Sequence, residues 1–330
     1  MNTGRLALHS SFIIHHSSFS LRVLAVLDKG LPSRPPDAVN GGLLSRLPES
    51  HRLAAEHVWR CFSNVQGFAG LFITGSVARG LESPDDLDFI AVWDRPISDQ
   101  QRRLLVERCR GNRTVDPDTD RFHLNGVVPE FHFMAGKEQV QRLISDFCWR
   151  GEIPPETDAD RMEGLLASLM DALPVFDPEA LAHQWQKMLT SDYPPEYQLR
   201  RVHEQYTAAC RRLAHLHRCQ RWNDVFYLAR IRLEFCEHIV KALVSLNRRF
   251  YWGGKWFEQQ IERMPLKPER TWPRVCTILT APDVPAAEDE MKRLAFSVGK
   301  IVGASLPEID VDVSLKIIRH LKKDTETKNE

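Results

Sequence analysis

The spacing of apolar residues changes after about residue 150 of the chain. Before that point, short apolar runs of the length of buried strands alternate with segments whose apolar positions recur as on one face of a helix. The predicted strands are 69–74, 87–93 and a hairpin of 121–124 and 127–134 around Asn125-Gly126; the predicted helices are 53–62, 100–109 and 137–147. This part of the sequence therefore predicts an α+β unit.

Helical spacing dominates from Asp158 onward. The predicted helices are 161–173, 178–190, 196–217, 223–246, 255–263 and 286–302, with prolines at the joints. An all-α helical bundle is expected to follow the α+β unit. The predicted divisions are a tail and linker over 1–45, the α+β domain over 46–152, the bundle over 153–322 and a frayed tail over 323–330.

Composition narrows the class of protein only slightly. Hydrophobic residues make up 43% and charged residues 27%, which is typical of a globular protein. The 44 basic and 44 acidic residues balance, so net charge indicates no particular partner. The seven cysteines form no C-x-x-C pair, and no apolar stretch approaches the roughly 18 residues of a membrane span. We expect a cytoplasmic protein without a membrane partner.

The first residues carry a short repeat, His-Ser-Ser-Phe at 9–12 and again at 16–19. Polar groups interrupt the apolar residues between the copies, unlike the core of a signal peptide. We interpret this segment as a low-complexity tail, or as upstream DNA translated from a misassigned start codon.

Two aspartates open the predicted strand at 87–93. Asp86 and Asp88 are two positions apart, so their side chains point to the same side of a strand. Carboxylates held that close repel one another, and a cation between them offsets the repulsion. Mg²⁺ prefers such oxygen ligands together with substrate phosphates. The alternative is a solvated acidic loop before an ordinary strand.

A glycine turn precedes these aspartates. Gly75-Ser76 follows a predicted strand and begins a short helix, where a phosphate can approach the backbone N–H groups. Nine residues, 77–85, separate Ser76 from Asp86. A phosphate-binding turn and a pair of metal-binding carboxylates are thus predicted on adjacent elements.

This combination resembles the DNA polymerase beta-like nucleotidyltransferase superfamily, whose members share a Gly-Ser turn, a short spacer and Asp-x-Asp entering a strand. The resemblance covers residues 48–150, and Ala78-Arg79-Gly80 is similar to the bacterial branch with the minimal nucleotidyltransferases and kanamycin nucleotidyltransferase. Asp85 departs from the serine usual in that branch, and its extra charge would reshape phosphate binding.

The resemblance implies a nucleotidyltransferase-type mixed sheet with flanking helices. It also implies an enzyme that transfers a nucleoside monophosphate from an NTP to an acceptor hydroxyl, with two Mg²⁺ ions as cofactors. Gly75, Ser76 and Arg79 would bind the nucleotide. Asp86 and Asp88 would hold the metal together with a third carboxylate on a neighbouring strand.

Glu130 matches that third carboxylate, as a metal ligand or as a general base. His132 shares the face of Glu130 on a strand and is a further candidate. The alternative is a surface glutamate on an edge strand, which Pro129 favours. Asp116 and Asp118 are the substitutes for Glu130.

The helical part adds basic and aromatic candidates. Residues 200–255 contain twelve arginines and lysines against four acids, which indicates either a face for a polyanion or a solvated helix surface. The segment 247–256 is dense in aromatic and basic residues, and we expect it to stack on a base while Lys255 contacts a phosphate. Arg232 and His238 fit the Arg-x(4–6)-His pattern of HEPN ribonuclease domains, although such pairs arise readily by chance here.

Three functions remain open from the sequence. The first is a nucleotidyltransferase acting on a small molecule such as an aminoglycoside. The second is a regulatory module that binds a nucleotide without turnover. The third is a toxin–antitoxin component that modifies protein or RNA. The sequence leaves the oligomeric state open.

Overall fold

A computed structural model describes residues 45–81, 86–111, 121–124, 126–150, 159–219, 224–311 and 316. The expected tail and linker up to residue 44 and the expected C-terminal tail, 323–330, lie outside these ranges. Asp85, Asp116, Asp118 and Asn125 also lie outside them.

The first part of the chain forms a mixed four-stranded sheet, as the sequence predicted. Its order is β3-β2-β1-β4, and β1 pairs antiparallel with both β2 and β4 whereas β2 pairs parallel with β3. The strands are β1 Phe68–Ile73, β2 Asp86–Trp93, β3 Val128–Gly136 and β4 Leu173–Phe176.

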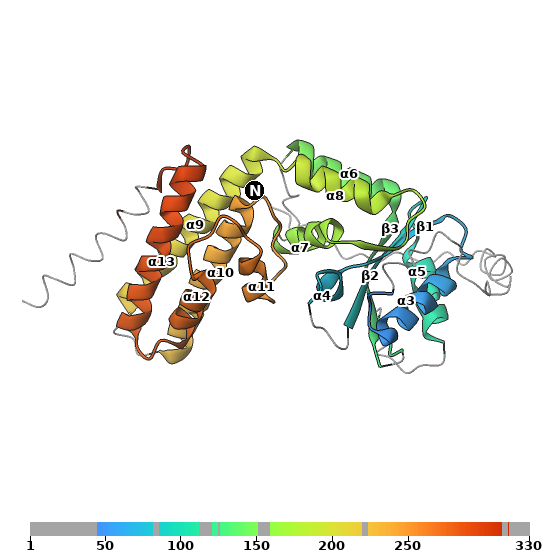
Figure 1. The fold of residues 1–330 in the computed structure, drawn as a ribbon, viewed down its shortest axis with the longest axis horizontal. Helices are drawn as coiled ribbons and strands as arrows, with labels where there is room; N and C mark the ends of the chain where they lie inside the picture. The colour runs from blue at the N-terminus through green and yellow to red at the C-terminus, as the bar shows by residue number, and fades with distance from the viewer. Residues whose placement is uncertain are drawn as a thin grey trace, which may run out of the picture.

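Helices cover both faces of the sheet (Figure 1). They are α3 Glu49–Phe62, α4 Gly75–Ala78, α5 Asp99–Arg110, α6 Lys137–Arg150, α7 Ala159–Met170 and α8 Leu181–Ser191. On β2, Leu87 and Phe89 pack on the side of α3 and α5, whereas Ile90 and Val92 pack on the side of α6, α7 and α8. Alternate side chains of β2 therefore enter two separate cores, as in any strand covered on both faces.

Strand β4 corrects the sequence interpretation of residues 161–173 as one helix. Helix α7 ends at Met170, and Leu173–Phe176 joins the edge of the sheet beside β1. Pro174 cannot donate to a ladder and is compatible only with such an edge. The sheet thus takes a strand from beyond residue 152, and α7 and α8 belong to its covering layer.

The predicted hairpin before β3 is present in the described residues. Leu124 bridges Val127, and Arg121 bridges Glu130, both antiparallel. Gly126 has φ of 81°, the left-handed conformation that Asn-Gly turns require. The Arg121–Leu124 segment therefore lies beside the start of β3 through two isolated bridges, whereas β2 is the neighbour of β3 within the sheet.

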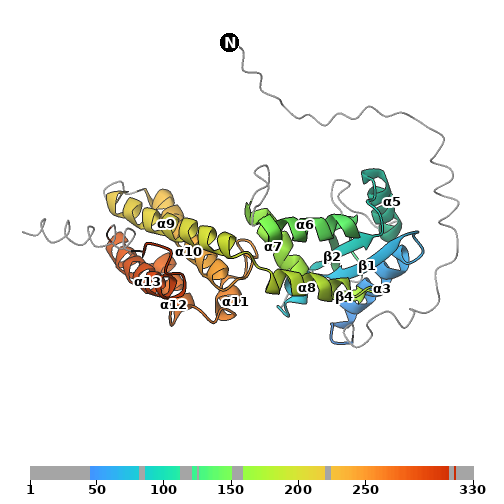
Figure 2. The same cartoon turned by 90° about the horizontal axis from the view of Figure 1, so that it is seen from above.

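The predicted helical bundle follows and lies end to end with the sheet (Figures 1 and 2). Its helices are α9 Pro195–Cys219, α10 Val225–Leu246, α11 Phe257–Glu262, α12 Thr271–Thr280 and α13 Val284–Ser305. Their apolar faces form one core that includes Tyr206, Phe235 and Leu294. Among the described residues, no helix is long and apolar enough to cross a membrane.

Four charged residues connect α7 to α9 and α10, and we call them the junction network: Asp160, Glu163, Arg201 and Lys241. Arg201 contacts Glu163 at 2.7 Å and Asp160 at 2.7 Å, and Lys241 contacts Asp160 at 2.6 Å. The Glu163 side chain is only 2% exposed. Because a buried carboxylate without partners is costly, Glu163 on α7 is stabilised where it is by Arg201 on α9.

Candidate active site

The two aspartates of the predicted motif lie at the N-terminal end of β2. The exposed Asp86 is the first residue of the strand, and Asp88 follows it with a side chain that is 15% exposed. The buried Leu87 lies between them and points to the opposite face. Asp86 and Asp88 are therefore on the face shared with Ile90, toward α6, α7 and α8.

Glu130 lies directly beside Asp88. In the parallel pairing of β2 with β3, Asp86 aligns with Val128 and Asp88 aligns with Glu130. The structure thus brings together the second aspartate and the third carboxylate expected from the sequence. Glu130 also forms an ion pair of 2.6 Å with Arg121, a residue that the sequence analysis did not consider.

The Gly75 turn contacts Asp88. The backbone N–H of Thr74 donates to the carbonyl oxygen of Asp88 at 2.9 Å. Gly75 has φ of +66°, and a Cβ added there would lie 1.8 Å from Oδ2 of Asp88. Only glycine fits this position, since any side chain would displace the carboxylate.

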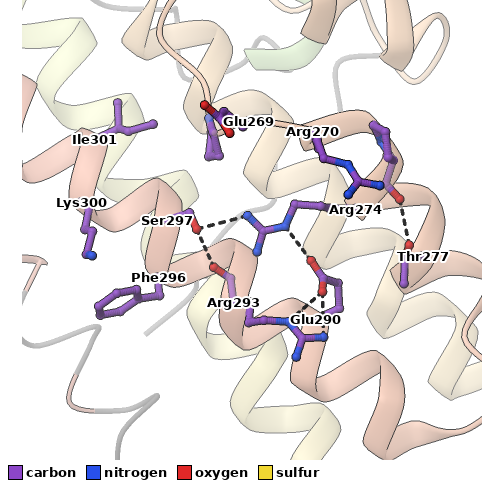
Figure 3. Close-up of a pocket in the computed structure, with 12 residues that line it drawn as sticks. Glu269, Arg270, Arg274, Thr277, Glu290, Arg293, Phe296, Ser297, Lys300 and Ile301 are labelled. Atoms are coloured by element: carbon purple, nitrogen blue, oxygen red, sulfur yellow. Dashed lines mark hydrogen bonds and ion pairs between the residues drawn. The ribbon is translucent and has the colours of Figure 1, made fainter.

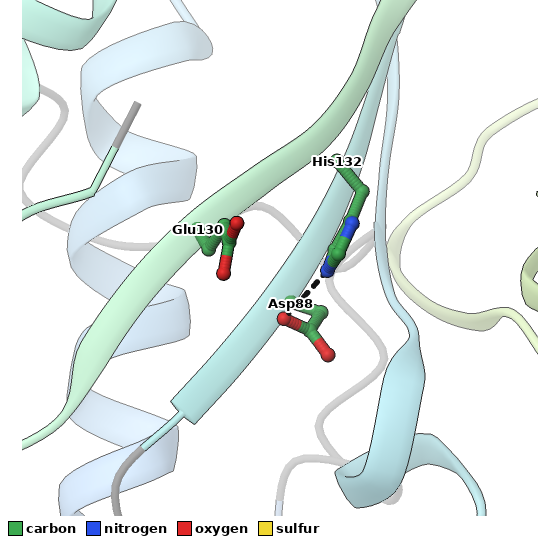
Figure 4. A group of neighbouring side chains, drawn as sticks. All are labelled: Asp88, Glu130 and His132. Carbon is green, nitrogen blue, oxygen red and sulfur yellow. Dashed lines mark ion pairs between the residues drawn. The ribbon is translucent and has the colours of Figure 1, made fainter. Parts of the chain in front are cut away.

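His132 reaches the same carboxylate through an irregularity in β3. Phe131 aligns with Phe89 and residue 133 with Ile90, so His132 is an extra residue in the ladder, a β-bulge. Its Nε2 lies 2.8 Å from Oδ1 of Asp88 (Figure 4). The hydrogen bond to Asp88 raises the pKa of His132 above its usual value, although partial burial opposes this shift.

These three side chains are suited to holding a divalent cation. One ligand atom from each of Asp88, Glu130 and His132 lies within 4.8 Å of the others (Figure 4). Two carboxylates and an imidazole are donors that divalent metal ions accept. Gly75 adds to the fit, because its missing Cβ makes room for the Asp88 carboxylate. Asp86 lies outside this group of three, although it is on the same face of β2.

Ser76 and Arg79 follow the turn but differ in their surroundings. Ser76 is half-buried within α4. The Arg79 side chain is 7% exposed and donates to Asp171 at 2.6 Å. Its guanidinium also lies 4.5 Å from the ring centre of Trp252, whose other cationic neighbour is Arg263 at 5.1 Å. Arg79 thus connects the turn to the bundle.

The aromatic and basic segment 247–256 is largely used in packing. Phe250 and Tyr251 are buried, and Trp252 stacks with the two arginines. Lys255 is exposed, and in the part of the chain that is described it forms no ion pair. Of the residues in this segment, Lys255 alone was predicted to contact a phosphate.

The HEPN-like pair has other partners. Arg232 donates to the carbonyl oxygens of Ala281 and Asp283, each at 2.9 Å. His238 is half-buried and hydrogen-bonded to Gln205 at 2.8 Å. Both side chains hold helices of the bundle together.

A cavity of about 640 Å³ lies between α12 and α13 in the bundle (Figure 3). Arg274 and Arg293 on its wall both pair with Glu290, at 2.6 and 2.9 Å. The lining carries four basic residues against two acidic ones, so the wall keeps a net positive charge. None of the site residues predicted from the sequence lines it.

The chain is similar to one protein family and to two solved structures. Residues 162–257, from α7 to the start of α11, match a family described as "Domain of unknown function (DUF4037)". A search of curated proteins finds no match. Among solved structures, a nucleotidyltransferase-like protein from Exiguobacterium sibiricum 255-15 is similar at 10% identity and a TM-score of 0.36, covering 84% of this chain and 91% of its own.

A second solved structure is the spectinomycin adenyltransferase AAD(9) from Enterococcus faecialis with ATP and spectinomycin. It is 14% identical with a TM-score of 0.31, covering 75% of this chain and 98% of its own. Likeness at this level establishes no shared activity.

Proposed function

We propose that the protein is a nucleotidyltransferase that transfers a nucleoside monophosphate from a metal-bound NTP to a hydroxyl of a small acceptor. The observation that supports this proposal is the contact of the Gly75 turn with Asp88, beside Glu130 on the next strand. The backbone that would bind the phosphates and the carboxylates that would bind the metal are then close enough to contact the same triphosphate. Such closeness is what phosphoryl transfer requires, because its catalysis is mainly positioning and charge neutralisation.

In this proposal, Asp86, Asp88 and Glu130 would hold Mg²⁺, and the bound ion would supply neutralisation of the phosphate charge. Gly75 and Ser76 present the backbone to the phosphates. Glu130 would also accept the proton of the attacking hydroxyl after its ion pair with Arg121 opens.

The two other residues proposed to bind the nucleotide, Arg79 and Lys255, differ in their contacts within the protein. Arg79 acts by holding the turn, since Asp171 and Trp252 already engage its guanidinium. The exposed Lys255 remains available to a phosphate. The acceptor would bind on the face of β2 toward the helical part, because Asp86 and Asp88 point to that side.

The decisive experiment is to incubate the protein with each Mg-NTP and candidate acceptors and to measure pyrophosphate release. Asp88→Asn should lower release by more than about 100-fold, because it removes a metal-binding charge. Asp94→Asn is the matched control, since Asp94 follows the far end of β2 and pairs with Lys137 at 2.9 Å. Equal release from the two variants would exclude the proposal.

A second candidate function is a module that binds a nucleotide without turnover. The ion pairs of Asp88 with His132 and of Glu130 with Arg121 favour it, because both carboxylates already have partners within the chain. Tight binding of Mg-ATP without pyrophosphate release for any acceptor would support this module over the enzyme.

A further inference from the structure

His132 is the feature of the site that the proposed chemistry leaves unexplained. Three carboxylates suffice for a magnesium site, and an imidazole is a poor ligand for that ion. The backbone nevertheless departs from regular pairing at this residue, since His132 is the bulged position between the pairs at 131 and 133. Bulges of this kind re-aim side chains next to functional sites.

The bulge delivers Nε2 of His132 to Asp88 at 2.8 Å. On its other side the carboxylate of Asp88 packs against Gly75, where a Cβ would lie 1.8 Å from Oδ2. Glu130 contributes from the same strand as His132. It uses Oε2 for Arg121 at 2.6 Å, and a carboxylate has a second oxygen to offer.

We propose that Asp88, Glu130 and His132 form a metal site whose imidazole selects a first-row transition ion, with Mn²⁺ as the representative, over Mg²⁺. The donor atoms lie within 4.8 Å of one another, from which small side-chain rotations bring all three onto one ion. Carboxylates accept Mg²⁺ and Mn²⁺ alike, whereas an imidazole nitrogen adds affinity mainly for the transition ion.

The role of the ion in catalysis rests on the proposed function, but the selectivity does not. Isothermal titration of the purified full-length chain with Mn²⁺ and with Mg²⁺, without nucleotide, measures it directly. The wild-type protein should bind Mn²⁺ at least about tenfold more tightly than Mg²⁺.

His132→Gln should weaken Mn²⁺ binding by about 10- to 100-fold while changing Mg²⁺ binding less than about twofold. His123→Gln is the matched control, since His123 is an exposed histidine in the strand segment beside β3. An unchanged ratio of Mn²⁺ to Mg²⁺ affinity in His132→Gln would overturn the inference.

Pulsed EPR of bound Mn²⁺ gives a second readout that does not depend on how well the variant folds. The wild-type spectrum should show ¹⁴N coupling from a coordinated imidazole, and its absence would overturn the inference. Pyrophosphate release separates the two proposals. Pyrophosphate release without Mn²⁺ selectivity would support the proposed nucleotidyltransferase and exclude the metal-selecting role of His132. Mn²⁺ selectivity without pyrophosphate release would support that role of His132 and exclude the proposed nucleotidyltransferase.

Discussion

Replacing Gly75 with alanine should disable the site while leaving the fold in place. The new Cβ would lie 1.8 Å from Oδ2 of Asp88, whereas an ordinary contact begins at 3.4 Å, so the carboxylate must move by about 1.6 Å. A misplacement of about 1 Å at a reacting centre can cost roughly 100-fold in rate. We therefore expect pyrophosphate release and metal affinity each to fall at least about 100-fold.

Gly80→Ala is the matched control for this prediction. Gly80 has the same φ of +66°, but a Cβ there meets nothing within 4 Å. Both variants should lose about 1–2 kcal/mol of unfolding free energy from the left-handed backbone, measured by urea denaturation. Only Gly75→Ala should lose metal binding and pyrophosphate release. Equal behaviour of the two variants would refute the contact between the turn and Asp88 as the basis of the site.

Three other predictions concern the contacts between sheet and bundle. Glu163→Gln should lower the unfolding free energy by about 1–3 kcal/mol in urea denaturation, because a buried charge-assisted hydrogen bond is lost while Arg201 keeps Asp160 as a charged partner; an unchanged unfolding free energy would contradict this. Trp252→Ala should lower the unfolding free energy by about 1–3 kcal/mol through lost packing with Arg79. It should also weaken nucleotide binding measured by calorimetry; an unchanged nucleotide affinity would show that Trp252 does not support the Gly75 turn. Burial alone would raise the pKa of Asp160, but hydrogen bonds from Lys241 and Arg201 lower this pKa overall. The stabilising contribution of Asp160 is therefore present above its unfolded pKa of about 4 and is lost as pH falls through its lower folded pKa. Comparing thermal unfolding of wild type and Asp160→Asn across pH 2–6 checks this, and their difference should shrink toward the acid end.

The sequence predicted the features that depend on neighbouring residues. Spacing of apolar positions predicted the α+β unit and the bundle, and the resemblance implied a mixed sheet with flanking helices; the structure confirms this fold class. The separation of two residues between Asp86 and Asp88 placed them on one face of a strand, because side chains alternate. Gly75-Ser76 was predicted as a turn between a strand and a short helix, and Gly75 is the first residue of α4, directly after β1 and Thr74.

Features that depend on distant residues were not predictable in this way. Arg79 meets Asp171, 92 residues away, only because β4 joins β1 and brings the end of α7 beside the turn. Pro174 is a local sign that the helix ends before it, but only the pairing with β1 identifies Leu173–Phe176 as a strand of this sheet. The bulge at His132 likewise depends on the pairing of β3 with β2, which the order of residues in β3 does not specify.

The same contacts explain why the turn and the bundle are mechanically connected. Gly75 touches Asp88, and four positions later Arg79 engages Asp171 and the ring of Trp252. Arg263, directly after α11, donates to the carbonyl oxygen of Arg79, and its guanidinium lies 5.1 Å from the centre of the Trp252 ring. A shift of the bundle would therefore move Arg79, and α4 would transmit this movement to Gly75, which packs against Asp88. Because α4 has only four residues, it can absorb little of that displacement before the geometry at Asp88 changes.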